Sequence, residues 1–73
     1  QLFIKRELLH SNAALGSAGE VRNHLLTAFQ NNYISKEKYD ILDTKTIEII
    51  KMLYGYIKRL KSGLVDNSYA AEP

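Results

Sequence analysis

The chain contains no cysteine and no tryptophan, and only one proline and four glycines among its 73 residues. The lack of cysteine excludes disulfide bonds and thiolate metal sites, and it fits the reducing cytoplasm in which we expect the protein to work. No apolar run is close to the length of a membrane span, which is about 18 residues. The first residues also lack the charged-then-apolar layout of a signal peptide. We therefore expect no membrane association. The chain opens on Gln1 rather than Met, as expected of a processed or partial piece.

What the chain does contain is apolar surface in a short length. Apolar residues make up 45% of the sequence, which is too many for a chain that is disordered throughout. At 73 residues there is room for one domain at most, and a lone core of this size is marginal.

The second half carries an apolar stripe with the period of one helix face. Its members alternate three and four residues apart: Tyr39, Leu42, Thr46, Ile49, Leu53, Tyr56 and Leu60. The face is widened by Ile47, Ile50, Tyr54 and Ile57. We predict a helix over about residues 36–61, and we expect more than one neighbouring helix to cover so wide a face.

A first helix is predicted over about residues 2–30. Its stripe consists of Ile4, Leu8, Ser11, Leu15, Ala18, Val21, Leu25 and Ala28. Gly16 and Gly19 lie in its middle, and each glycine costs roughly 1 kcal/mol against alanine inside a helix. We expect these glycines to permit a close helix contact. The alternative is a bend near Gly16 that divides the segment into two helices.

The segment between the two helices carries stop and start signals. Asn31 and Asn32 favour a helix end, because asparagine tolerates the left-handed conformation found there. Ser35 is a candidate N-cap for the second helix. So short a connection predicts an antiparallel hairpin, and we expect Tyr33 and Ile34 to fold inward and plug its end.

The second helix is expected to end at Ser62 and Gly63, because glycine suits the position after a last helical turn. This predicts a helical hairpin over residues 1–63, which would form part of a four-helix bundle. Residues 64–73 lack periodicity and are predicted to be a tail.

The positive charge is unevenly placed. Lys51, Lys58, Arg59 and Lys61 fall within eleven residues that contain no acid. Such a cluster can bind phosphates or an acidic protein surface. The alternative is a solvated helix end, where the helix dipole favours cations.

No catalytic constellation is found in the sequence. His10 and His24 lie about 21 Å apart along one helix and cannot share a metal within one chain. Glu20 and His24 are four residues apart, which is a weak metal signal and more often an exposed helix pair. We expect no enzyme, metal, cofactor or small-molecule substrate. The enzymatic alternative is a metal site built by His24 and Glu20 of several subunits.

The five tyrosines can be interpreted in two ways. Aromatic rings stack on nucleobases, but Tyr39 and Tyr56 lie on the apolar stripe and Tyr54 lies beside it. We therefore expect these rings to pack in the core, with their hydroxyls at its rim.

Several segments together carry a family resemblance. The strongest runs from Ala14 to Leu25 and includes Gly16-Ser17 and Glu20. Further matches follow in order: Asn32-Tyr33-Ile34, Tyr39, Leu42 and Met52-Leu53-Tyr54-Gly55-Tyr56-Ile57-Lys58. Over about residues 14–61 the chain resembles the bacterial four-helix-bundle family of 23S rRNA intervening-sequence proteins. That family includes the accessory variability proteins of diversity-generating retroelements.

The resemblance implies an all-α, antiparallel up-down four-helix bundle. The chain departs from the family pattern in two respects. Asn32 stands where the family commonly has glycine, which is tolerable because asparagine also accepts positive φ. The segments that normally precede the Gly-Ser helix are not found, so the chain looks like the two C-terminal long helices of four.

The resemblance also implies a function. Family members form ring-like homopentamers, none is known as an enzyme, and some bind nucleic acid and a reverse transcriptase through basic surface. The candidate nucleic-acid-binding residues in this chain are Arg22, Lys51, Lys58, Arg59 and Lys61. The candidate packing and oligomer residues are Leu15, Ala18, Val21, Leu25, Tyr39, Leu42, Ile49, Leu53, Tyr56 and Leu60.

Two functions follow from these features. The first is a non-enzymatic, self-associating helical scaffold that binds RNA or DNA through a basic surface. The alternative is a protein–protein interaction module without nucleic-acid binding, in which the basic cluster meets acidic residues of a neighbour.

Overall fold

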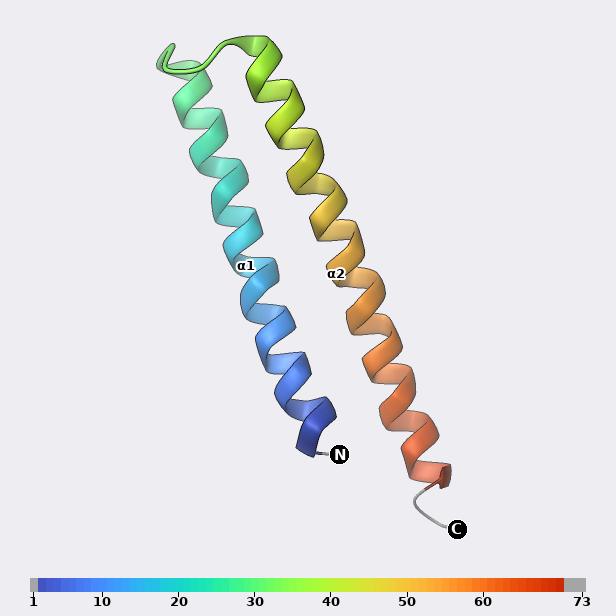
Figure 1. Cartoon of the computed structure of the whole chain (residues 1–73). Helices are drawn as coiled ribbons and strands as arrows, with labels where there is room; N and C mark the ends of the chain where they lie inside the picture. Colours follow the sequence, from blue (N-terminus) through green and yellow to red (C-terminus); the bar gives the residue numbers. More distant parts are fainter. Residues whose placement is uncertain (1, 71–73) are drawn as a thin grey trace.

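The protein is an antiparallel helical hairpin in a computed structural model, which describes the backbone of residues 2–70 and the side chains of residues 2–63. Helix α1 spans Leu2–Gln30 and helix α2 spans Lys36–Ala70. The helices lie side by side, so the start of α1 and the end of α2 share one end of the hairpin (Figure 1). The predicted all-α fold is confirmed for the described residues, and the pair is consistent with two helices of a four-helix bundle.

The hairpin is long and thin, with principal extents of 59 × 15 × 11 Å and a radius of gyration of 16.9 Å. A globular chain of this length would have a radius of gyration of about 11 Å. The interior is correspondingly small. Among the described side chains the buried ones are Ser11, Ala18, Thr46, Ile57 and Leu60.

The helices meet along what we call the hairpin seam, whose residues alternate four and three apart. From α1 it contains Ile4, Leu8, Ser11, Leu15, Ala18, Arg22, Leu25 and Phe29. From α2 it contains Tyr39, Asp43, Thr46, Ile50, Leu53, Ile57 and Leu60. All of them are buried or half-buried except Arg22. A seven-residue repeat is typical of helices that coil around each other with a left-handed twist.

The end of α1 is fixed by backbone hydrogen bonds. The Tyr33 N–H donates to the Ala28 carbonyl at 2.8 Å, and the Asn32 N–H donates to the Phe29 carbonyl at 3.0 Å. Asn32 has a φ of 63°. This bond pair around a left-handed residue is the Schellman motif. The predicted helix stop is therefore confirmed, and the asparagine side chain tolerates the backbone conformation it requires.

The start of α2 is capped by Ser35, as predicted. The Lys38 N–H donates to the Ser35 Oγ at 3.1 Å. The prediction that Tyr33 plugs the hairpin end is wrong, because Tyr33 is 82% exposed. The end is closed instead by Phe29 and Tyr39, whose rings stack with centroids 4.9 Å apart. These two seam residues face each other across the turn, which leaves Tyr33 outside.

The predicted end of the second helix is also wrong, because α2 continues through Gly63 to Ala70. No glycine of the described residues has positive φ, so Gly63 does not form the left-handed stop that its position suggested. A Cβ on Gly63 would lie 3.6 Å from the Ile4 Cδ1 atom. Gly63 thus lies against Ile4 near the start of α1, and α2 extends further than the sequence predicted. Residues 71–73 of the predicted tail lie outside the described residues.

The glycines of α1 do not act as predicted within the hairpin. Helix α1 is continuous, which confirms the favoured interpretation over a bend near Gly16. However, a Cβ built on Gly16 or Gly19 would meet nothing within 4 Å. The expected close contact is therefore not one between α1 and α2.

We expect Gly63→Ala to raise the free energy of unfolding by about 1 kcal/mol, because the residue lies inside a helix. The added methyl group would make an ordinary van der Waals contact with Ile4. Urea unfolding followed by circular dichroism measures the change. Gly16→Ala, which adds a methyl group in open space, is the matched control and should give a similar gain. A loss of stability in Gly63→Ala alone would contradict the continuous helix.

Candidate functional site

The five predicted basic residues do not form one surface. Arg22 lies in the hairpin seam, where it is paired with Asp43. Lys51, Lys58 and Lys61 are exposed along one side of α2, spaced seven and three residues apart. The remaining cation, Arg59, lines a groove on the other side of α2.

The Arg22–Asp43 pair is an ion pair between the two helices. The Arg22 Nε donates to Asp43 Oδ1 at 2.8 Å, and Nη2 donates to Oδ2 at 3.2 Å. This two-point geometry is the strong form of an arginine–carboxylate bond. The hydrogen bond from Arg22 lowers the pKa of the Asp43 carboxyl below its ordinary value of 3.8. Arg22 is thus engaged within the hairpin and is set apart from the three exposed lysines.

We expect the Arg22–Asp43 pair to make folding acid-sensitive. Because the pKa of Asp43 is lowered in the folded chain, the stabilisation is complete above the unfolded pKa of about 3.9 and is lost as pH falls through the folded pKa. Thermal unfolding between about pH 6 and pH 2 measures this. Asp43→Asn keeps the side-chain shape and should show a shallower pH dependence. Equal pH profiles for both chains would contradict a stabilising pair.

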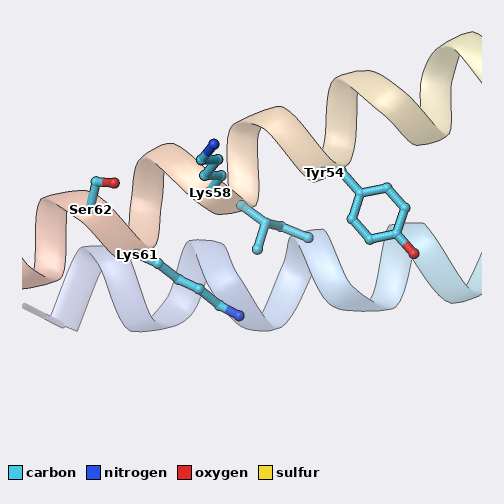
Figure 2. Close-up of a pocket in the computed structure, with 5 residues that line it drawn as sticks. Tyr54, Lys58, Lys61 and Ser62 are labelled. Carbon is cyan, nitrogen blue, oxygen red and sulfur yellow. The ribbon is translucent and has the colours of Figure 1, made fainter.

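We call the exposed row Lys51, Tyr54, Lys58 and Lys61 the basic flank. Its members are three, four and three residues apart, which places them on one face of α2. Within this face, Figure 2 shows Tyr54 and Lys61 extending toward α1, whereas Lys58 points away from α1. No acidic residue occurs between Lys51 and Lys61. The basic flank therefore combines three cations with one aromatic ring.

A shallow pocket lies within the basic flank. Its lining residues are Tyr54, Ile57, Lys58, Lys61 and Ser62. Ile57 is only 7% exposed and belongs to the hairpin seam, so it gives the pocket a fixed apolar floor. The two lysines and the serine hydroxyl supply polar groups around that floor. The pocket therefore combines apolar surface with two ammonium groups and one hydroxyl.

The tyrosines behave in two ways. Tyr39 and Tyr56 are half-buried, as predicted. The Tyr56 hydroxyl donates to the Glu7 carboxylate at 2.8 Å, and this bond raises the pKa of Tyr56. Tyr54 differs from the prediction, because it is 59% exposed in the hairpin. It lies beyond the edge of the seam, on the flank opposite Tyr56.

The opposite side of the hairpin presents what we call the open face. It comprises Ala14, Val21 and Ala28 of α1 and Leu42, Ile49, Met52 and Tyr56 of α2. The Glu7–Tyr56 hydrogen bond fixes the register of this side. Steps of seven residues from it place Ala14 opposite Ile49 and Val21 opposite Leu42. The side chains of the open face are thus smaller along α1 than along α2.

The open face is apolar and uncovered. Val21 is 46% exposed, Leu42 42%, Ile49 51% and Met52 72%. A groove along α2 is lined by Ile49, Met52, Leu53, Gly55, Tyr56 and Arg59. Contiguous apolar surface of this kind marks contacts with another protein surface.

The predicted packing residues divide between the two surfaces. Six lie in the hairpin seam, namely Leu15, Ala18, Leu25, Tyr39, Leu53 and Leu60. Val21, Leu42 and Ile49 lie on the open face, and Tyr56 lies at the boundary between the two. Sequence reasoning missed the seam roles of Arg22, Asp43 and Phe29. The signal that could have found them is a second row of residues in each helix, which also alternates three and four apart. This row includes Arg22 and Phe29 in α1 and Asp43 in α2.

His10, Glu20 and His24 are all exposed. Within the described part of the chain, no three His, Cys, Asp or Glu side chains gather closely enough to hold a metal ion. Neither helix, as far as it is described, has a stretch apolar enough to cross a membrane.

The two packed helices are consistent with two helices of a helical bundle. The family model for 23S rRNA-intervening sequence protein matches residues 4–55, which is more than half of the chain. The chain therefore belongs to this family, and the resemblance found in the sequence is confirmed. The pocket residues Ile57, Lys58 and Lys61 lie beyond the matched segment. No curated protein and no solved structure matches the chain.

Proposed function

We propose that the protein is a non-enzymatic helical scaffold that associates with copies of itself through the open face and binds RNA or DNA through the basic flank. The observation that carries the proposal is the separation of these two surfaces. Ile49 and Lys58 are nine residues apart, which is about two and a half helical turns, so they project from opposite sides of α2. One side can assemble while the other stays open to a partner.

For the open face, a second copy of this chain is the occupant that the surface fits. A row of small residues on α1 lies beside a row of large ones on α2. When two copies meet about a two-fold axis, the large side chains of each copy lie over the small ones of the other. Four helices would then enclose Leu42 and Ile49. A two-fold contact closes with two copies, so the homopentamer that the family resemblance implies would need the open face of each copy to meet a different surface of the next copy.

For the basic flank, nucleic acid is supported by charge and by the family. Lys51, Lys58 and Lys61 are exposed, and no acid lies between them in the sequence. The family resemblance implies nucleic-acid binding for some members, and we propose RNA as the first ligand to test. We retain a reverse transcriptase as a proposed protein partner from the resemblance. We also place the protein in the cytoplasm, because a chain without cysteine suits a reducing compartment.

RNA affinity at two salt concentrations tests the nucleic-acid half of the proposal. Phosphate binding by three lysines predicts that log K falls with log salt by about 0.7 per contact on a single strand. Changing Lys51, Lys58 and Lys61 together to Glu should weaken binding at least about tenfold at low salt and lower the salt slope by up to about 2. If the folded wild-type chain does not bind RNA at low salt, the proposed nucleic-acid binding is contradicted.

The alternative is an interaction module in which the basic residues contact an acidic protein surface. A triple replacement by Glu distinguishes the two functions, and it changes Lys58, Arg59 and Lys61. Because Arg59 borders the open-face groove, its own contribution has to be measured separately. Arg59→Glu alone is therefore the matched control. If charge reversal on the basic flank changes the mass of the assembly and leaves RNA affinity unchanged, the interaction module is correct. Light scattering measures the mass.

A further inference from the structure

The pocket in the basic flank brings an aromatic ring, a buried aliphatic side chain and two lysines together. We propose that Tyr54 stacks on a base of single-stranded RNA while Lys58 and Lys61 bind neighbouring phosphates of the same strand. This deepens the proposed function, on which it rests, by assigning a base-binding site and a preference for single strands.

The first support is the exposure of Tyr54. It is 59% exposed, whereas Tyr39 and Tyr56 are half-buried and packed. A tyrosine ring open to solvent and bordered by lysines can stack on a base, because every base has an aromatic face. The lysines beside the ring supply the positive charge that binds the phosphates of the same strand.

The second support is the pocket floor. Ile57 is 7% exposed and fixed in the hairpin seam, directly beside Tyr54 in the pocket lining. An apolar side chain next to an aromatic ring offers a surface on which a flat base can lie. Ser62 contributes a hydroxyl that can donate to or accept from a base edge or a ribose.

The third support is the position of the cations. Figure 2 shows Lys61 extending on the side of α1, as Tyr54 does, and Lys58 pointing away from α1. Both lysines follow Tyr54 along α2, four and seven residues further on, so a strand that runs from the stacked base toward the end of α2 passes both ammonium groups. Lys51 lies about 15 Å along the axis from Lys61, which lets it contact a neighbouring phosphate.

A single strand is favoured over a duplex for a physical reason. In a duplex the faces of the bases are stacked on each other and cannot reach a ring on the protein surface. In a single strand one base can leave the stack and enter the pocket. The lysines alone would bind both forms, so the contribution of Tyr54 should appear only with the single strand.

The experiment measures affinity for a 12-nucleotide single-stranded RNA and for the same sequence as a duplex, at fixed salt. Tyr54→Leu should lose about 5- to 150-fold for the single strand and little for the duplex. Tyr54→Phe, which keeps the ring, should retain wild-type affinity. Tyr33→Leu is the matched control, because Tyr33 is 82% exposed and lies at the other end of the hairpin.

The salt slope separates this proposal from the one on which it rests. Tyr54→Leu should leave the slope unchanged, because it removes no phosphate contact, whereas the lysine variants lower it. Equal binding by Tyr54→Leu and wild type, or wild-type preference for duplex, overturns the stacking site alone. Failure of the wild type to bind either RNA overturns both proposals. Displacement of RNA by polyglutamate but not by polyuridylate of equal charge overturns both in favour of an acidic protein partner.

Discussion

Replacing Ile49 with Asp is expected to dissociate the proposed assembly into single hairpins. Ile49 is 51% exposed in the hairpin and lies at the middle of the open face, so a second copy would cover it. An unpaired carboxylate in such a contact loses its water without gaining a partner, which costs several kcal/mol. We therefore expect association to weaken more than about 100-fold. Light scattering over a range of concentrations measures the mass.

Thr44→Asp is the matched control for Ile49→Asp. It adds the same charge to the same helix at an exposed position outside both the open face and the seam. Its assembly should have the wild-type mass. Leu42→Ser, a milder change on the same face, should weaken association in the same direction. A wild-type chain that is a stable monomer, or an Ile49→Asp chain with unchanged mass, would contradict the proposed role of the open face.

Replacing Ile57 with Ala is expected to destabilise the hairpin itself. Ile57 is 7% exposed and is one of the few buried apolar side chains among the described residues. Removing a buried isoleucine side chain costs about 2–5 kcal/mol, part of which comes from the cavity left behind. A domain is stable by only about 5–15 kcal/mol in total, so this loss is a large fraction. Chemical unfolding followed by circular dichroism measures it.

Leu9→Ala is the control for Ile57→Ala. Leu9 is 69% exposed on the outer side of α1, and its replacement should change the free energy of unfolding by less than about 0.5 kcal/mol. Equal losses in the two variants would mean that the hairpin seam is not the core of the folded chain. A loss confined to Ile57→Ala would assign the stability of the hairpin to the seam.

The helix ends show which local features sequence reasoning can and cannot place. The stop at Asn32 and the cap at Ser35 were predictable, because each depends on one residue and the few backbone groups beside it. The stop at Gly63 was not, because glycine only permits a left-handed conformation and does not require it. In the structure α2 continues past Gly63, which lies against Ile4 from the other end of the chain.

The basic surface shows the same division. Sequence reasoning found five basic residues but could not group them. Arg22 belongs with Asp43, twenty-one positions away, and that pairing exists only because two antiparallel helices bring the residues together. Lys51, Lys58 and Lys61 share a face through helical spacing alone, and this grouping could be read from the sequence.

The sequence by itself determined two long helices, a short capped turn between them and more apolar surface than one helix pair can cover, because helical periodicity and turn chemistry are local. Only the tertiary structure decided which row of α2 faces α1. The rows through Leu42 and Ile49 and through Asp43 and Ile50 share Tyr39, Thr46 and Leu53, and both alternate three and four. The rotation of one helix against the other places Asp43 next to Arg22, turns Ile50 inward and leaves Ile49 exposed.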